Sequence, residues 1–172
     1  SAAVYKEGNN LTENSEYSFD NKYGVSKLLS SKLLTFYKNL YNFPSVELRY
    51  FSIYGDWEKK DRLVMSAINS GLKKKSFVFN SKNQIRDYIY IDDAVDALLL
   101  AFKNNKIKGI FNICSSNKQG THNLVKIIYK KLGLKNDRIN ENFIKRHNTI
   151  KKLVGNNLKA KKILKWKPKI SI

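Results

Sequence analysis

The chain has 172 residues, of which 42% are hydrophobic and 12% aromatic, and this composition indicates a globular protein and excludes a disordered one. Its formal net charge is +19, from 33 Lys and Arg against 14 Asp and Glu. The longest apolar runs, such as residues 94–102, are too short to span a bilayer. The single cysteine, Cys114, can form neither an internal disulfide nor a cysteine zinc site, so we expect a cytoplasmic protein with no membrane contact.

A positive charge of this size suggests nucleic acid as a possible partner. The excess is almost entirely lysine, whereas base reading favours arginine, and no nucleic-acid-binding motif is present. We therefore expect nucleic acid not to be the partner, although a basic chain would help to attract an anionic substrate such as a diphosphate. The two histidines, His122 and His147, show no metal-ligand spacing, so no metal site is expected.

Short β-rich runs alternate with helical stretches along the chain, which predicts an α/β fold. Residues 2–5 are expected to form a strand end, and residues 21–42 a long helix with leucines at helical spacing, followed by Pro44. The further predicted elements are strands at 46–51, 77–79, 87–90 and 110–113, and helices at 62–72, 94–103, 121–133 and 156–164. Asp92 or Asp93 is expected to cap the helix 94–103, because a carboxylate accepts from its first free N–H groups.

The most informative pair is Tyr23 and Lys27, which stand four residues apart in the predicted helix 21–42. Positions i and i+4 of a helix lie on the same face. A fixed ammonium beside a phenol favours the phenolate, so such a pair could take a proton from a sugar hydroxyl or return one. The spacing alone is a weak signal, and the alternative is an ordinary tyrosine and lysine on a helix surface.

Six segments in one order strengthen this interpretation. They are Ser1-Ala2-Ala3-Val4-Tyr5, Tyr23-Gly24-Val25-Ser26-Lys27, residues 48–55 (LRYFSIYG), residues 86–93 (RDYIYIDD), residues 111–115 (FNICS) and residues 160–168 (AKKILKWKP). Together they resemble the NAD-dependent epimerase/dehydratase family, the extended short-chain dehydrogenases/reductases that act on nucleotide sugars. The resemblance covers essentially the whole chain.

The resemblance implies an α/β fold made of the C-terminal part of a Rossmann-like doubly wound parallel sheet and a small α/β substrate-binding domain. Residues 1–55 would be the remainder of the dinucleotide-binding domain with the catalytic helix. Residues 56–172 would be mostly the nucleotide-sugar domain, with segments 86–115 returning to the main sheet. No GxGxxG or GxxGxxG motif occurs, although the family begins with a Gly-rich turn that holds the cofactor pyrophosphate. We therefore expect an internal portion of a longer protein.

The resemblance also implies roles for single residues. Tyr23 would be the acid/base, Lys27 would bind the nicotinamide ribose, and Ser1 would hydrogen-bond the reacting oxygen. Tyr50 and Phe51 match the strand end that approaches the nicotinamide of NAD or NADP. Ordinary strand packing is the alternative for these two, because aromatic residues suit strands.

Three residues match positions that contact the nucleotide sugar in the family: Ser52, Arg62 and Arg86. A guanidinium pairs with two phosphate oxygens better than an ammonium does, which suits Arg86 to a diphosphate. The alternative for Arg86 is a surface salt bridge with Asp87. Ser52 stands in place of the usual Asn and can still hydrogen-bond, with less reach and one donor in place of two. Asp56 replaces the usual Pro after Tyr54-Gly55, so this loop is expected to be less rigid.

The function implied is that of an NAD(P)-dependent nucleotide-sugar epimerase or 4-keto reductase. Ala2-Ala3 stands where the 4,6-dehydratases carry an acidic pair, which disfavours dehydration. A non-catalytic nucleotide-sugar-binding module is the alternative, and a basic nucleic-acid-binding protein is a more distant one. The expected partners are a nucleotide-diphospho-sugar and, in the complete protein, a second copy in a homodimer.

Overall fold

The computed structural model describes residues 1–79, 84–143 and 150–172, except for the side chains of 141–143. His147 lies outside the described residues. The elements are η1 (Ala2–Val4), β1 (Gly8–Leu11), α1 (Lys22–Tyr41), β2 (Val46–Tyr50), β3 (Ser52–Tyr54), α2 (Leu63–Leu72), β4 (Phe77–Phe79), β5 (Ile85–Arg86), β6 (Tyr88–Tyr90), α3 (Ile91–Lys103), β7 (Gly109–Ile113), β8 (Gln119–Gly120), α4 (Thr121–Lys131), η2 (Asn136–Arg138), β9 (Ile139–Phe143), β10 (Lys152–Gly155) and η3 (Ala160–Leu164).

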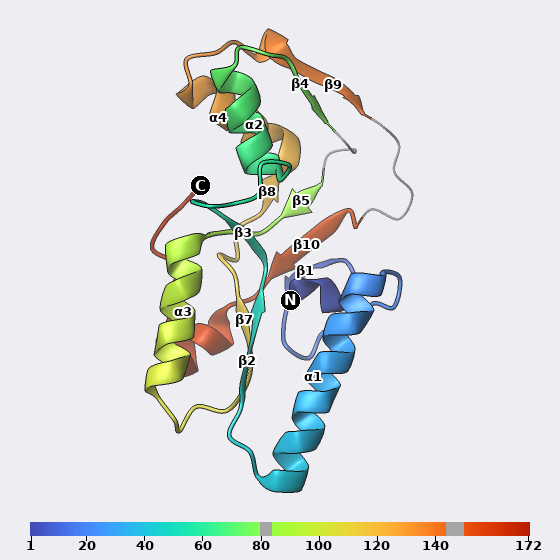
Figure 1. Ribbon diagram of the computed structural model, residues 1–172, viewed down its shortest axis with the longest axis vertical. Coiled ribbons are helices and arrows are strands. Elements are labelled where there is room, and N and C mark those ends of the chain that lie inside the picture. The colour runs from blue at the N-terminus through green and yellow to red at the C-terminus, as the bar shows by residue number, and fades with distance from the viewer. Residues whose placement is uncertain (80–83, 144–149) are drawn as a thin grey trace.

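Parallel pairing dominates the strands. Strand β2 pairs with β7, β3 with β6, β4 with β9, and β10 lies between β1 and β5, all in parallel, while β8 joins β5 in antiparallel orientation. Helices α1 and α3 flank the β2–β7 pair, and α2 and α4 lie together with β4 and β9 at the other end of the molecule (Figure 1). The predicted α/β class with parallel strands is confirmed.

Helix α1 shows how local sequence sets the boundaries of an element. The side chain of Asn21 accepts a hydrogen bond from the Gly24 amide, so it caps one of the N–H groups that a helix start leaves free. At the other end Asn42 adopts the left-handed conformation, with φ of 50°, that commonly ends helices. The predicted range 21–42 therefore marks the two capping residues of this helix.

Two local predictions were wrong. Residues 2–4 form a 3-10 helix and not a strand, because the amide of Tyr5 turns back to the carbonyl of Ala2 at 3.1 Å. Helix α3 begins at Ile91, and its N-cap residue, Tyr90, makes no side-chain capping bond. The carboxylate of Asp93 instead accepts bonds from the backbone of the C-terminal segment, so a tertiary contact replaces the predicted local cap.

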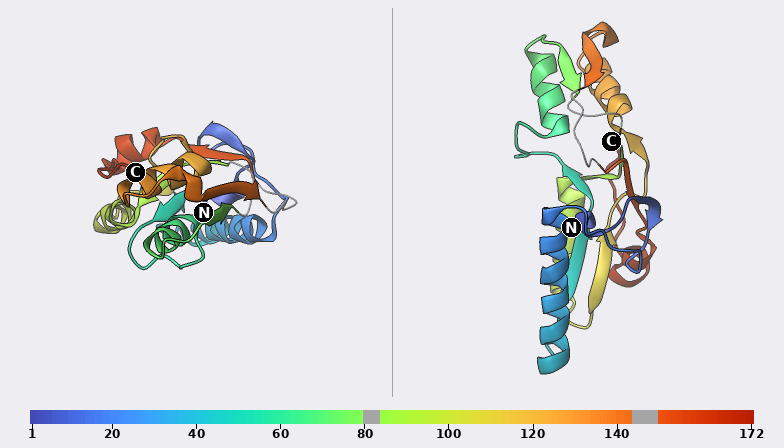
Figure 2. Two further views of the ribbon diagram at one scale, coloured as in Figure 1. Left: turned by 90° about the horizontal axis from the view of Figure 1, so that it is seen from above. Right: turned by 90° about the vertical axis from the view of Figure 1, so that its right-hand side faces the viewer.

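Three buried clusters hold the layers together. One surrounds Tyr5 and Phe51, a second lies between the strands and α3 around Phe111 and Trp166, and a third fills the space between α2, α4, β4 and β9 around Tyr129. Helix α1 and the C-terminal segment with η3 lie on opposite sides of the β2–β7 pair (Figure 2, right). Both sides of this parallel pair are therefore covered, as is usual for parallel sheets. Within the described ranges, no helix is both long and apolar enough to cross a membrane.

Candidate functional site

Tyr23 and Lys27 lie on one exposed face at the start of α1. The Lys27 ammonium is 5.6 Å from the centre of the Tyr23 ring, and the Tyr23 side chain is 57% exposed. The two residues are thus close enough for the cation to act on the ring, and both remain open to a ligand. The role of this pair in proton transfer stays a prediction.

The first turn of α1 packs directly against η1. A Cβ atom at Gly24 would lie 2.2 Å from the carbonyl oxygen of Ala3, so only glycine permits this approach. Ser1 is half-buried at the N-cap of η1, where its hydroxyl accepts a hydrogen bond from the Ala3 amide at 3.3 Å. Residues 1–3 therefore stand beside the turn of α1 that carries Tyr23.

Tyr50 and Phe51 point toward different parts of the core. The Tyr50 hydroxyl donates to the Ala94 carbonyl of α3 at 3.1 Å, and burial raises the pKa of Tyr50 to about 12. Phe51 is buried in the cluster around Tyr5, with its ring centre 6.4 Å from the ring centre of Tyr5. The structure gives both side chains packing partners, and their roles toward a cofactor stay predictions.

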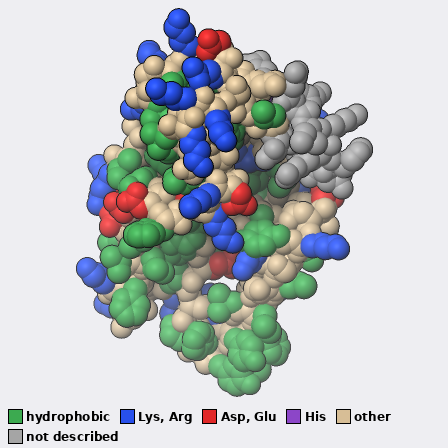
Figure 3. Space-filling model, turned by 45° about the horizontal axis from the view of Figure 1, so that its top comes forward, with side chains coloured by type: hydrophobic (Ala, Val, Ile, Leu, Met, Phe, Trp, Pro, Cys, Tyr) green, Lys and Arg blue, Asp and Glu red, His purple; other side chains and the backbone are tan. Residues whose placement is uncertain are grey.

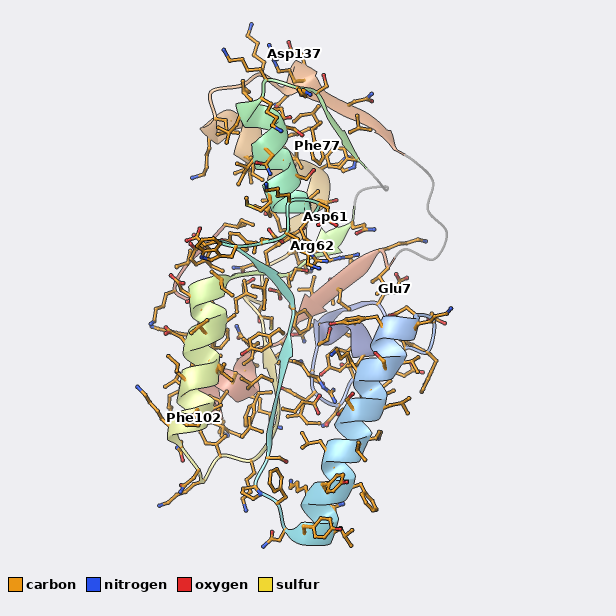
Figure 4. The ribbon with its side chains drawn as sticks, in the orientation of Figure 1. Glu7, Asp61, Arg62, Phe77, Phe102 and Asp137 are labelled. Carbon is orange, nitrogen blue, oxygen red and sulfur yellow. The ribbon has the colours of Figure 1, made fainter. Side chains whose placement is uncertain are left out.

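A cavity of about 380 Å³ opens between the start of α2 and strands β3 to β6. It is lined by Ser52, Ile53, Glu58, Asp61, Arg62, Leu63, Val64, Ser66, Phe77, Phe79, Gln84, Arg86, Tyr88 and Thr121. The structure thus brings Ser52, Arg62 and Arg86 together, although 34 residues separate the first from the last. Figure 4 shows Asp61 and Arg62 at the lower end of α2, below Phe77 of β4.

Arg86 is held by neutral oxygen atoms. Its guanidinium donates to the Gln84 side chain and the Ile150 carbonyl, both at 2.7 Å, and to the Ile85 carbonyl at 3.1 Å. Burial lowers the pKa of Arg86 below its ordinary value, with opposing contributions from Tyr88 and Glu7. A partly buried cation with no carboxylate bonded to it among the described side chains gains most from an incoming anion.

The alternative of an Arg86–Asp87 salt bridge is wrong. Asp87 is fully buried, and its carboxylate accepts from the amide and hydroxyl of Ser115, both at 2.7 Å, and from the amides of Ser116 at 3.0 Å and Gly155 at 3.1 Å. These four bonds join the link between β5 and β6, where Asp87 lies, to the segment after β7 and to the end of β10. They leave Arg86 available on the cavity side.

Sequence reasoning missed two groups of charged residues. One is the buried guanidinium of Arg49, which donates to Glu47 at 2.6 Å, to the Tyr5 hydroxyl at 2.9 Å and to the Ser31 hydroxyl at 3.2 Å. Ser31 stands four residues after Lys27 on α1, so this network fixes the helix that carries the Tyr23–Lys27 pair. Glu47 lies two residues from Arg49 on β2, but Tyr5 and Ser31 come from other segments, so the sequence does not mark the network as a whole.

The other missed group is the acidic pair in the cavity. Glu58 has a side chain only 14% exposed, with its Oε1 atom 3.8 Å from Nε of Arg62. Asp61 lines the same cavity and is exposed. The spacing of Glu58 and Arg62 (i, i+4) was a signal for an ion pair, but not for its place in a cavity. Across the described ranges, no group of three His, Cys, Asp or Glu residues could hold a metal ion.

Known proteins match both the sequence and the fold. A family model described as the NAD dependent epimerase/dehydratase family matches residues 1–114. A putative UDP-glucose 4-epimerase of Methanocaldococcus jannaschii is 30% identical over 99% of this chain and 56% of its own length. An ADP-L-glycero-D-manno-heptose-6-epimerase of Brachyspira hyodysenteriae is 35% identical over 74% of this chain and 43% of its own length.

The fold also matches a solved enzyme. The UDP-glucuronic acid 4-epimerase of Bacillus cereus, in complex with UDP-glucuronic acid and NAD, superposes with a TM-score of 0.88 at 26% identity, over 99% of this chain and 55% of that chain. The chain therefore spans about half the length of the relatives it matches. The matched residues include the Tyr23–Lys27 pair and most of the cavity. The chain belongs to the NAD dependent epimerase/dehydratase family.

Proposed function

We propose that the full-length protein is an NAD(P)-dependent nucleotide-sugar epimerase or 4-keto reductase of carbohydrate biosynthesis. The observation that carries this proposal is the convergence of Ser52, Arg62 and Arg86 on one cavity. Two guanidinium groups and a hydroxyl suit a diphosphate, and the cavity is large enough to take part of a nucleotide sugar. The names of the relatives support this class, since they act on UDP-, ADP- or similar nucleotide sugars.

The exposed face of α1 supplies the proposed chemistry. Tyr23 takes a proton from a sugar hydroxyl or returns it, with the Lys27 ammonium 5.6 Å from the centre of its ring. The Ser1 hydroxyl hydrogen-bonds the same sugar oxygen. The bond from the Ala3 amide uses the hydroxyl oxygen as an acceptor, so the hydroxyl proton can still be donated.

The same face fits a dinucleotide cofactor. Tyr23 and Lys27 are exposed, and the close approach at Gly24 leaves no Cβ between the helix and η1. Lys27 and Tyr23 would hold the ribose of NAD or NADP, with Tyr50 and Phe51 forming the strand end beneath it. When bound, the cofactor supplies the hydride acceptor and donor for the sugar carbon.

The test compares matched variants of the full-length protein. Tyr23→Phe should abolish turnover of a panel of nucleotide sugars and leave NAD(P) affinity nearly unchanged, as measured by product analysis and calorimetry. Tyr41→Phe removes a hydroxyl from the same helix, 18 residues further on, and should leave turnover intact. Near-normal turnover of Tyr23→Phe would remove Tyr23 from the mechanism. Binding of nucleotide sugars with no turnover by the wild type would favour a non-catalytic binding module.

We also propose a homodimer in the cytoplasm. Large apolar side chains on and after α1 are exposed: Leu29, Leu33, Phe36, Tyr37, Leu40, Tyr41 and Phe43. Hydrophobic side chains gather at the lower edge of the face in Figure 3. Such a stripe on a 20-residue helix favours burial against the same helix of a second copy. Leu33→Glu should convert the dimer to a monomer in light scattering, whereas Lys32→Glu should not.

A further inference from the structure

The start of α2 is occupied by a carboxylate. Helix α2 begins at Leu63, and its N-cap residue, Arg62, makes no side-chain capping bond in the described structure. The carboxylate of Glu58 instead lies near this helix start, with its Oε1 atom 3.8 Å from Nε of Arg62. The free N–H groups and the dipole of a helix start favour an anion at this place, and here the anion belongs to the chain itself.

This carboxylate also faces the cations of the cavity. Its Oε1 atom is 3.8 Å from Nε of Arg62, and Glu58, Arg62 and Arg86 all act electrostatically on the hydroxyl of Tyr88. The Oε2 atom of Glu58 is buried and has no hydrogen-bond partner among the described residues. A buried carboxylate with one oxygen unbonded is a costly arrangement that a purely structural role does not explain.

We propose that Glu58 is an affinity-determining residue, an internal counter-ion that occupies the anion subsite of the cavity and weakens the binding of nucleotide sugars. This inference rests on the proposed function, which assigns Arg62 and Arg86 to the diphosphate. A diphosphate that approaches Arg62 meets the negative charge of Glu58 in a partly buried place, where water screens repulsion poorly. The ligand must then displace the carboxylate or bind beside it.

The strength of this competition depends on pH. Burial raises the pKa of the Glu58 carboxyl above its ordinary value, Asp61 adds to the rise, and Arg62 and the Met65 amide oppose it. Among the described residues, the other titratable groups that line the cavity are Arg86 of β5 and Tyr88 of β6. Protonation of Glu58 removes its negative charge, so affinity for a diphosphate should rise as the pH falls through the raised pKa.

The experiment compares Glu58→Gln with Asp61→Asn in the full-length protein. Both changes remove one negative charge from the cavity lining, but Asp61 is exposed to water. The probes are UDP-, dTDP-, GDP- and ADP-glucose, whose phosphates are both esterified and keep their charge over the pH range used. Calorimetry should give a dissociation constant about three- to tenfold lower for Glu58→Gln at neutral pH, and a smaller change for Asp61→Asn.

The pH series supplies the second readout. The wild type and Glu58→Gln should converge in affinity as the pH falls through the raised pKa of the Glu58 carboxyl, because the wild-type side chain then becomes neutral. Unchanged or weaker binding by Glu58→Gln would overturn the inference and leave the proposed function standing. An equal gain in affinity from Asp61→Asn would also overturn it, because the net charge of the cavity lining, and not the position of Glu58, would then explain the gain. No binding of any probe by either form would overturn the proposed function itself and the inference with it.

Discussion

Asp87 and Glu58 are both enclosed carboxylates, and they differ in how completely they are bonded. Asp87 accepts four hydrogen bonds from Ser115, Ser116 and Gly155. Glu58 lies 3.8 Å from Arg62 and leaves its buried Oε2 atom without a hydrogen-bond partner among the described residues. A polar group whose bonds are complete stabilises one structure, whereas one with an open bond is available to a ligand or competes with it.

Arg49 and Arg62 also differ in how completely they are bonded. Arg49 is fully buried and bonds to Glu47, Tyr5 and Ser31, so its guanidinium is not accessible to a ligand. Arg62 is 65% exposed at the cavity, with its carboxylate partner at the long distance of 3.8 Å. Substitutions in the Arg49 and Asp87 networks should therefore act on stability, and substitutions in the cavity should act on binding.

The largest expected effect is on stability, from Arg49→Met. The variant leaves Glu47 without its cation and removes a donor from Tyr5 and Ser31, which should lower the free energy of unfolding by about 3–5 kcal/mol. Chemical denaturation measures this. Lys6→Met breaks the exposed Lys6–Glu16 pair and should cost less than about 1 kcal/mol. Equal losses in the two variants would show that burial does not distinguish these ion pairs.

A second loss of stability is expected from Asp87→Asn. The amide group cannot accept all four bonds and turns an N–H group toward other donors, which should cost about 2–3 kcal/mol. Asp96→Asn is the matched control, because Asp96 pairs with Lys169 near the surface. The thermal midpoint of Asp87→Asn should fall well below that of Asp96→Asn. A midpoint equal to the wild-type value would contradict the structural role of the Asp87 network.

In the cavity the main effect should be on binding. Arg86→Ala removes a charged hydrogen bond to the diphosphate, worth about 1.5–3 kcal/mol, and should raise the Michaelis constant for the nucleotide sugar about ten- to 150-fold. Arg138→Ala removes an exposed arginine that bonds the Lys74 carbonyl near the outer end of α2 and should leave the constant unchanged. An unaltered Michaelis constant for Arg86→Ala would place Arg86 outside the substrate site.

The smallest effect concerns Glu58 and pH in the absence of ligand. Because burial raises its pKa in the folded protein, the folded state holds the proton more tightly than the unfolded state does. The stability of the wild type relative to Glu58→Gln should therefore fall as the pH rises from the ordinary glutamate pKa through the raised value. Denaturation curves at a series of pH values measure this difference. A wild type that gains relative stability over this range would show that its charge is well paired.

Local signals predicted the elements whose causes are local. The ends of α1 follow from Asn21 and Asn42, and the strand at Val46–Tyr50 follows from its β-rich run. Asp93 shows the limit of such reasoning, since it has the position of a helix cap but bonds the C-terminal backbone at Lys169 and Ile170. Strand β10 was not predicted either, because its pairing with β1 and β5 involves segments far away in the chain.

The candidate site also combines features that the sequence predicts with features that depend on the tertiary structure. The sequence by itself determined the spacing of Tyr23 and Lys27, because four residues of helix bring two side chains to one face wherever the helix lies. The resemblance to the family identified Ser52, Arg62 and Arg86 as separate candidates. Only the tertiary structure decided that these three share a cavity, and that Glu58 shares it with them. A helix sets the spacing of side chains four residues apart through its own backbone. A cavity, in contrast, forms only where segments distant in the sequence pack against one another and leave a space between them.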